Sequence, residues 1–165
     1  MSDTSKILIV DDEPIVCELL EEALSDQGYH ITSCHNGTEA LKSSAKHSYD
    51  LVLLDIGLPD MNGFQAMDDI RKKSPKTLVI MMTGDATIES AVDALKSGAY
   101  DYLRKPIRIE ELFYTIKNAL DHKRLDETRR QSEEALRESE EGFRALVENS
   151  LIGICIIQNN RIVYL

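Results

Sequence analysis

Carboxylate groups stand directly after apolar runs at two places in the sequence. Asp11 and Asp12 follow the run Lys6–Val10, and Asp55 follows the run Leu51–Leu54. Two carboxylates about 4 Å apart repel each other by roughly 4 kcal/mol at an effective dielectric constant of about 20, so a cluster of them needs protonation or a cation. Oxygen ligands without a neighbouring His or Cys favour a hard ion such as Mg2+. The sequence predicts a magnesium site wherever these acids meet.

A hydroxyl and an ammonium group follow two further apolar runs. Thr83 follows the run Leu78–Met82, and Lys105 comes shortly after Tyr100–Leu103. Beside a divalent cation, the Asp55 carboxylate could attack phosphorus and become an acyl phosphate. Lys105 would balance phosphoryl charge and Thr83 would donate a hydrogen bond. Taken alone, Thr83 fits a helix cap or a loop, and Lys105 fits an ordinary surface lysine.

Five short apolar runs alternate with amphipathic stretches, which is typical of an α/β fold with a parallel, doubly wound sheet. The runs are Lys6–Val10, Tyr29–Cys34, Leu51–Leu54, Leu78–Met82 and Tyr100–Leu103. The first, third and fourth are nearly continuous in hydrophobicity, which predicts central strands, and the other two predict strands nearer the edges. Ligands collect at the carboxyl ends of such strands, where the acids, the hydroxyl and the lysine all stand.

Helical periodicity fills the segments between these runs. The first helix begins at Pro14, which suits a first turn, and Gly28 suits its exit. Later helices are expected near Thr38–Lys46, Gly63–Lys73 and Ile88–Ser97, and from Ile109 onward.

Four segments, in this order and spacing, resemble a response-regulator receiver domain of two-component signalling. They are VDDEP, LLDIGLPDMNG, MMTGD and GAYDYLRKP. The resemblance covers residues 5–121 and implies a flavodoxin-like (βα)5 receiver fold. It further implies that a sensor histidine kinase or a phosphotransfer protein supplies the phosphoryl group, that Mg2+ is the cofactor, and that the chain catalyses only its own phosphotransfer and dephosphorylation.

The resemblance also assigns roles at the metal and phosphorylation site. It makes Asp55 the phosphoacceptor and Asp12 a direct Mg2+ ligand, with Asp11 acting mainly through a metal-bound water. The backbone carbonyl of Gly57 would supply another ligand. Gly57 and Asp85, each two residues beyond a site residue, are expected to flank the path of the water that hydrolyses the acyl phosphate.

A conformational switch is implied as well. Thr83 matches the hydroxyl residue of the family's switch and Tyr102 its aromatic partner, so phosphorylation would draw Thr83 inward and let the Tyr102 ring turn. Lys105-Pro106 matches a peptide that is usually cis in this family, a minority state for X-Pro bonds in general. Taken alone, Tyr102 is an aromatic residue near an edge strand, where packing is the commoner role.

Composition narrows the classes of partner and the compartment. With 29 acidic and 19 basic residues the net charge is −10, which disfavours nucleic-acid binding by this chain. Cys17, Cys34 and Cys155 lack disulfide or zinc spacing, which favours a reducing compartment. No stretch is long enough to span a membrane, and a cytoplasmic protein is expected. The histidines are expected on the surface or in loops, and they are His30, His35, His47 and His122.

After Leu120 the sequence becomes strongly charged and helix-forming, which predicts a helical linker over residues 122–142. Residues 143–165 are similar to the opening of a PAS sensor domain, a helix followed by strand, Asn-Asn turn and strand, cut off at its C-terminal side. In the linker, apolar residues share a helical seam with Arg129, Ser132 and Ser139. A solvated single helix and a homodimer through the helix after Ile109 and the linker fit this pattern equally. The seam's apolar residues are Leu125, Leu136, Phe143 and Leu146.

Three functions compete for this set of residues. The first is a phosphorylation-controlled receiver that relays its state to a downstream domain. The second is a receiver-like module for interaction or dimerisation that never uses phosphate, which the complete set of site residues disfavours. The third is a Mg2+-dependent aspartyl phosphohydrolase, but such enzymes need an acid two residues after the nucleophile, where this chain has Gly57.

Overall fold

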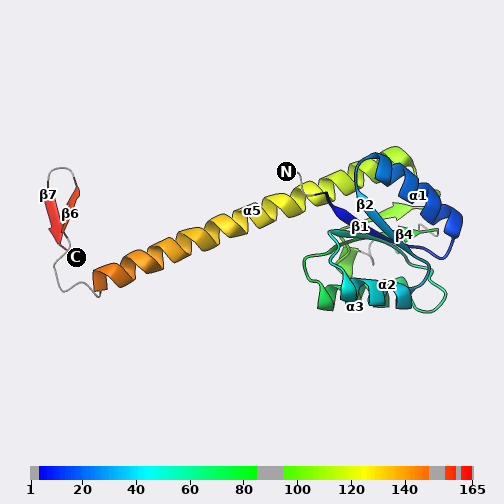
Figure 1. Cartoon of the computed structure of the whole chain (residues 1–165), viewed down its shortest axis with the longest axis horizontal. Helices are drawn as coiled ribbons and strands as arrows, with labels where there is room; N and C mark the ends of the chain where they lie inside the picture. The colour runs from blue at the N-terminus through cyan, green and yellow to red at the C-terminus, as the bar shows by residue number, and fades with distance from the viewer. Residues whose placement is uncertain (1–3, 85–94, 149–154, 159–160, 165) are drawn as a thin grey trace. The chain divides into compact units, whose positions relative to one another are not determined.

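A five-stranded parallel sheet forms the centre of the N-terminal part of the chain, residues 1–121, in the strand order β2-β1-β3-β4-β5 (Figure 1). This computed structural model describes residues 4–84, 95–148, 155–158 and 161–164. The strands are β1 (Lys6–Val10), β2 (His30–Cys34), β3 (Leu51–Asp55), β4 (Leu78–Thr83) and β5 (Asp101–Arg104). The three most hydrophobic runs are the interior strands and the two more polar runs are the edges, so the predicted sheet is confirmed.

Helices connect the strands and cover both faces of the sheet, as the sequence pattern predicts. They are α1 (Pro14–Asp26), α2 (Gly37–Lys46), α3 (Gly63–Lys73) and α5 (Ile109–Glu148). Asparagines cap two of them: the Asn36 side chain accepts the Glu39 N–H at 2.8 Å, and Asn62 accepts the Phe64 N–H at 2.8 Å. The helix expected over Ile88–Ser97 falls largely outside the described residues.

The core consists of two apolar layers, one on each face of the sheet. Because successive strand residues point to opposite faces, Leu8 and Val10 pack with α2 and α3, whereas Ile7 and Ile9 pack with α1 and the first turns of α5. Figure 1 shows α2 and α3 together on one side of the sheet and α1 on the other. Burial on both faces explains why the central strands are almost entirely apolar.

The chain divides into two compact units, residues 1–121 and residues 122–165. The second unit contains the remainder of α5 and an antiparallel strand pair, β6 (Cys155–Gln158) and β7 (Arg161–Tyr164). The two expected strands are therefore present, while the Asn-Asn turn between them lies outside the described residues. Helix α5 runs on to Glu148 without a break at residue 142, and no helix in the described part of the chain is long and apolar enough to cross a membrane.

Candidate functional site

The acids that follow β1 and β3 meet at one edge of the sheet. These strands are parallel neighbours with Val10 opposite Leu54, so Asp11 and Asp55 stand side by side at adjacent strand ends. Carboxylate oxygens of Asp11, Asp12 and Asp55 all lie within 4.8 Å of one another. Asp11 and Asp55 are buried and Asp12 is exposed. The structure thus brings together the three acids that the sequence singles out.

Lys105 reaches the same cluster from the end of β5. Its Nζ lies 2.7 Å from Oδ2 of Asp11 and 2.7 Å from Oδ2 of Asp55. Its backbone N–H donates to the Thr83 carbonyl at 2.8 Å, and the Lys105-Pro106 peptide is cis, as the resemblance implies. Glu13 Oε1, 3.4 Å from Nζ, is an additional partner that sequence reasoning left without a role, although it directly follows the two aspartates.

Burial and neighbouring charges shift the pKa values of Asp11 and Lys105. Loss of solvation raises the pKa of Asp11, and the neighbouring Asp55 adds to the rise, although Lys105 and the Glu13 N–H act in the opposite direction. Burial lowers the pKa of Lys105, but its contacts with Asp11 and Asp55 outweigh this effect and raise the pKa above its usual value. Lys105 is therefore an ammonium group, and the Asp11 carboxylate is more costly to keep charged than one in water.

One oxygen of the Asp11 side chain is ion-paired but has no well-aligned hydrogen bond. Oδ1 accepts the Glu13 N–H at 3.0 Å, but Oδ2 is buried and, although 2.7 Å from the Lys105 ammonium, has no hydrogen bond of normal angle. A buried carboxylate oxygen with an open lone pair, beside two other carboxylates, is a donor set that suits a hard divalent cation. The residues present therefore fit a Mg2+ site.

Thr83 and Tyr102 lie on adjacent strands and face the same side of the sheet. Thr83 is buried at the end of β4, and the register pairs Met81 with Tyr102 and Thr83 with Arg104. Strand alternation puts Thr83 on the same face as Met81, and the half-buried Tyr102 packs against the core layer to which Met81 belongs. The two residues expected to form the switch are thus diagonal neighbours.

Gly57 lies next to the side chain of the expected phosphoacceptor. Its N–H donates to Asp55 Oδ1 at 3.1 Å, and a Cβ at this position would lie 3.9 Å from the same oxygen. A side chain at position 57 would therefore extend from the immediate surroundings of the Asp55 carboxylate. Asp85, the other residue expected to flank the water path, lies outside the described residues.

A thiol and an imidazole contact the backbone of Asp11, which the sequence did not indicate. Cys17 Sγ donates to the Asp11 carbonyl at 3.4 Å, and His35 Nδ1 lies 3.3 Å from the same oxygen. Burial, with the Asp11 charge, raises the pKa of Cys17 to about 11, so its thiol is neutral. All the histidines are exposed, as expected, and no sequence spacing links His35 to Asp11.

Asp60, in the loop after β3, forms hydrogen bonds with the start of α2. The sequence did not predict this contact. Its Oδ1 accepts the Gly37 N–H at 2.8 Å, and its Oδ2 accepts the Thr38 N–H at 2.8 Å and the Thr38 hydroxyl at 2.6 Å. The Thr38 hydroxyl and these backbone donors lower the pKa of Asp60 to about 2. The loop that carries Gly57 is therefore held at both ends, by Asp60 and by β3.

A doubly wound sheet with acids, a buried hydroxyl and a lysine at its strand ends is the arrangement expected of a signalling receiver. The family model described as response regulator receiver domain matches residues 7–117, so the chain belongs to that family. Its members act in phosphorylation-dependent signalling, as the sequence motifs predict.

Curated relatives and solved structures agree with this assignment. The uncharacterized transcriptional regulatory protein YkoG of Bacillus subtilis is 43% identical over 69% of this chain and 50% of its own length. The transcriptional regulatory protein ZraR of Klebsiella oxytoca is 39% identical over 74% of this chain but only 28% of its own. The receiver domain protein (CheY-like) of Methanospirillum hungatei JF-1 has a TM-score of 0.72 at 32% identity, covering 75% of this chain and 99% of that one. The match thus covers half or less of these curated regulators.

Proposed function

We propose that Asp55 is the residue that receives the phosphoryl group, from a phosphohistidine of a sensor histidine kinase or a phosphotransfer protein. The observation that carries this proposal is the position of Lys105 Nζ, 2.7 Å from the Oδ2 atoms of both Asp55 and Asp11. An Asp55 oxygen attacks phosphorus, the P–N bond breaks, and its electron pair leaves with the imidazole nitrogen. The product is an acyl phosphate on Asp55.

Asp11, Asp12, Asp55 and the Gly57 carbonyl would hold Mg2+, with Asp11 acting mainly through a water. The ion would supply positive charge that offsets the charge on the phosphoryl oxygens during transfer. Lys105 supplies the second positive charge from the end of β5. Because its ammonium already contacts two carboxylates, it can exchange one of them for a phosphoryl oxygen without leaving the site.

Thr83 and Tyr102 carry the signal away from Asp55. The Thr83 hydroxyl donates a hydrogen bond to a phosphoryl oxygen, and its movement toward Asp55 frees space on the sheet face that Tyr102 shares. The ring then turns inward and alters the surface beside β5 and α5. The two conformations must differ in free energy by only a few kcal/mol. Phosphorylation can shift the equilibrium between them only by the difference between the free energies with which the phosphoryl group interacts with each conformation.

The remainder of the chain serves as a relay in this proposal. Residues 122–142 form a helical linker, residues 143–165 begin a PAS-like sensor domain, and two copies of the chain associate through α5. The continuity of α5 from Ile109 to Glu148 supports a mechanical connection between receiver and downstream domain. In this proposal the protein works in the cytoplasm. Its net negative charge, its cysteines without disulfide spacing and its dependence on a kinase partner support that location.

Phosphorylation by acetyl phosphate tests the central step. Incubation with Mg2+ and acetyl phosphate should add one phosphoryl group to the chain, located at Asp55 by tandem mass spectrometry after borohydride trapping. Asp55→Asn should abolish the addition, and Asp68→Asn, an exposed acid on α3, should not. A folded wild-type protein that binds Mg2+ but gains no phosphoryl group would refute the proposal.

A further inference from the structure

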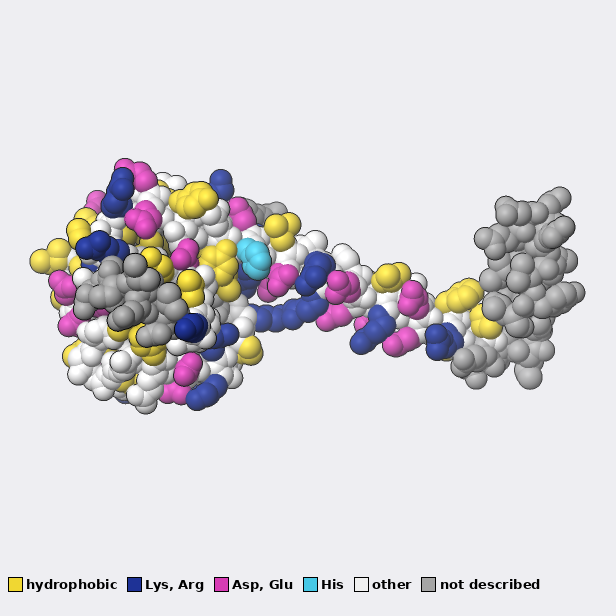
Figure 2. All heavy atoms as spheres, turned by 180° about the vertical axis from the view of Figure 1, so that it is seen from behind, with side chains coloured by type: hydrophobic (Ala, Val, Ile, Leu, Met, Phe, Trp, Pro, Cys, Tyr) yellow, Lys and Arg dark blue, Asp and Glu magenta, His cyan; other side chains and the backbone are white. Residues whose placement is uncertain are grey.

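The part of α5 that belongs to the second unit exposes four large hydrophobic side chains. Leu125 is 72% exposed, Leu136 62%, Phe143 54% and Leu146 70%. Figure 2 shows hydrophobic side chains in yellow between charged ones along this stretch of helix. An isolated helix gains little stability without packing of an apolar face, so the exposure of these residues indicates a missing partner.

The four hydrophobic residues lie on one side of the helix. At 3.6 residues per turn, their separations of eleven, seven and three positions confine them to about 80° of arc. Ser132 and Ser139 fall inside this arc and are small enough to let another helix approach closely. These six residues are called the α5 stripe, and they are Leu125, Ser132, Leu136, Ser139, Phe143 and Leu146.

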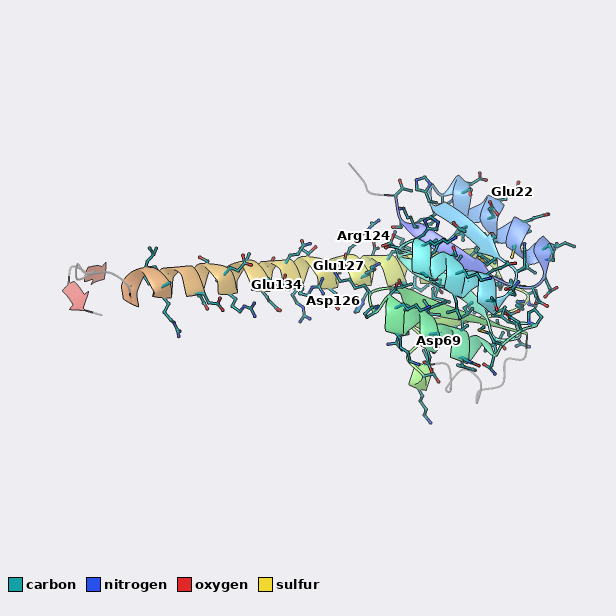
Figure 3. The ribbon with its side chains drawn as sticks, turned by 60° about the horizontal axis from the view of Figure 1, so that its bottom comes forward. Glu22, Asp69, Arg124, Asp126, Glu127 and Glu134 are labelled. Atoms are coloured by element: carbon teal, nitrogen blue, oxygen red, sulfur yellow. The ribbon has the colours of Figure 1, made fainter. Side chains whose placement is uncertain are left out.

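The two borders of the α5 stripe differ in charge. In the seven-residue repeat of a coiled coil, the positions that directly follow Leu125, Ser132 and Ser139 form one border, which is acidic and consists of Asp126, Glu133 and Glu140. The positions that directly precede Arg129, Leu136 and Phe143 form the other border, which carries no charge and consists of Thr128, Ala135 and Gly142. Figure 3 labels Asp126 and Glu134 on this helix. Glu134 comes nine positions after Leu125, which at 3.6 residues per turn puts it on the face opposite the stripe. This difference in charge between the two borders restricts which helix can pack on the stripe and whether that helix runs parallel or antiparallel to α5.

A second copy of the same helix satisfies the borders in only one orientation. In a parallel pair, the acidic border of each helix faces the uncharged border of the other. In an antiparallel pair the two acidic borders face each other, which brings together six carboxylates of like charge. We propose that α5 pairs in parallel with α5 of a second copy along the α5 stripe, a geometry that rests on the association proposed above.

Arg129 lies at the edge of the stripe and would face its counterpart in a parallel pair. Its guanidinium is drawn toward the acidic border, with Asp126 Oδ1 at 3.4 Å from Nη2 and Glu133 Oε1 at 4.0 Å from Nε. These two carboxylates offset the arginine charge and direct it away from the partner helix. Arg129→Leu should tighten the pair, because it removes a charge from the interface and extends the apolar stripe.

Disulfide crosslinking of the full chain tests the orientation. In a Cys155→Ser background, Ser132→Cys and Ser139→Cys should each give a disulfide-linked dimer under a mild oxidant, because a parallel pair brings every stripe residue next to its own counterpart. Glu134→Cys, on the opposite face, should remain monomeric under the same conditions. An antiparallel pair would crosslink at one of the two serine positions at most, and that result would overturn the orientation while leaving the association intact.

Sedimentation equilibrium separates this proposal from the receiver function. The wild type should dimerise, Leu136→Asp should raise the dissociation constant by about tenfold or more, and Arg129→Leu should lower it. A protein that stays monomeric at high concentration, or a Leu136→Asp variant that dimerises as tightly as the wild type, would overturn the pairing. Phosphorylation of Asp55 by acetyl phosphate should persist in Leu136→Asp, so failure of the dimer is distinguishable from failure of the receiver.

Discussion

Gly63, at the start of α3, lies directly against the backbone carbonyl of Asp55. A Cβ at position 63 would overlap that carbonyl oxygen and would approach Ile56 Cα to 2.7 Å. The Gly63 N–H also donates to the Ile56 carbonyl at 3.0 Å. The chain segment that follows Asp55, the proposed phosphoacceptor, is therefore packed against the helix that begins eight residues later, with no space for a side chain between them.

Gly63→Ala is expected to destabilise the receiver by roughly 1 to 3 kcal/mol, because backbone atoms must shift to admit the methyl group. It should also slow phosphorylation of Asp55, since the displaced atoms carry that carboxylate. Chemical denaturation and the rate with acetyl phosphate measure the two effects. Gly142→Ala is the matched control, because no atom lies within 4 Å of its Cβ position, and it should leave receiver unfolding unchanged. Equal stability of Gly63→Ala and wild type would show that the contact is not tight.

Mg2+ should raise the melting temperature of the receiver. A ligand that binds only the folded state stabilises it by about 2.7 kcal/mol at a concentration one hundred times its dissociation constant. Asp12→Asn should lose most of this response and still melt close to wild type without Mg2+, because Asp12 is exposed. Differential scanning calorimetry over a Mg2+ series, with Asp68→Asn as the control, gives the comparison. A full Mg2+ response in Asp12→Asn would remove that residue from the ligand set.

The contact of Asp60 with α2 should make stability depend on acid pH. The folded-state pKa of Asp60, about 2, is below the ordinary value of 3.8, so the unfolded chain binds its proton more readily. The stabilisation is complete above pH 4 to 5 and is lost as the pH falls toward about 2. Asp60→Asn should therefore show a shallower loss of stability across this window in urea unfolding, and Thr38→Val an intermediate one. Parallel pH curves for Asp60→Asn and wild type would contradict this assignment.

Cys17 is expected to resist thiol reagents in the native protein. It is 2% exposed, and its pKa of about 11 leaves little thiolate at pH 8. Burial also raises the pKa of Cys34. In a Cys155→Ser variant, Ellman's reagent should label neither thiol at pH 8 until denaturant is added, and both should then react. Rapid labelling of the folded variant would mean that the contact of Cys17 with the Asp11 carbonyl opens readily.

Local sequence was sufficient to predict the strands and which acids meet at one edge of the sheet. Val10 and Leu54 end apolar runs whose length and flanking helices allow only central parallel strands, and such strands deliver Asp11, Asp12 and Asp55 to one edge of the sheet. The edge position of β2 and β5 follows from their polar residues in the same way. These features depend on periodicity within about ten residues, which a single sequence displays directly.

The contacts between separate loops depended on the tertiary structure. Asp60 with Thr38, His35 with the Asp11 carbonyl, and Gly63 with the Asp55 carbonyl each join segments whose relative position follows from strand register and helix packing. No local pattern encodes these pairings, because a loop's residue types restrict its own backbone but not its neighbour across the fold. The sequence determined which groups reach the edge of the sheet, and packing decided which of their atoms touch.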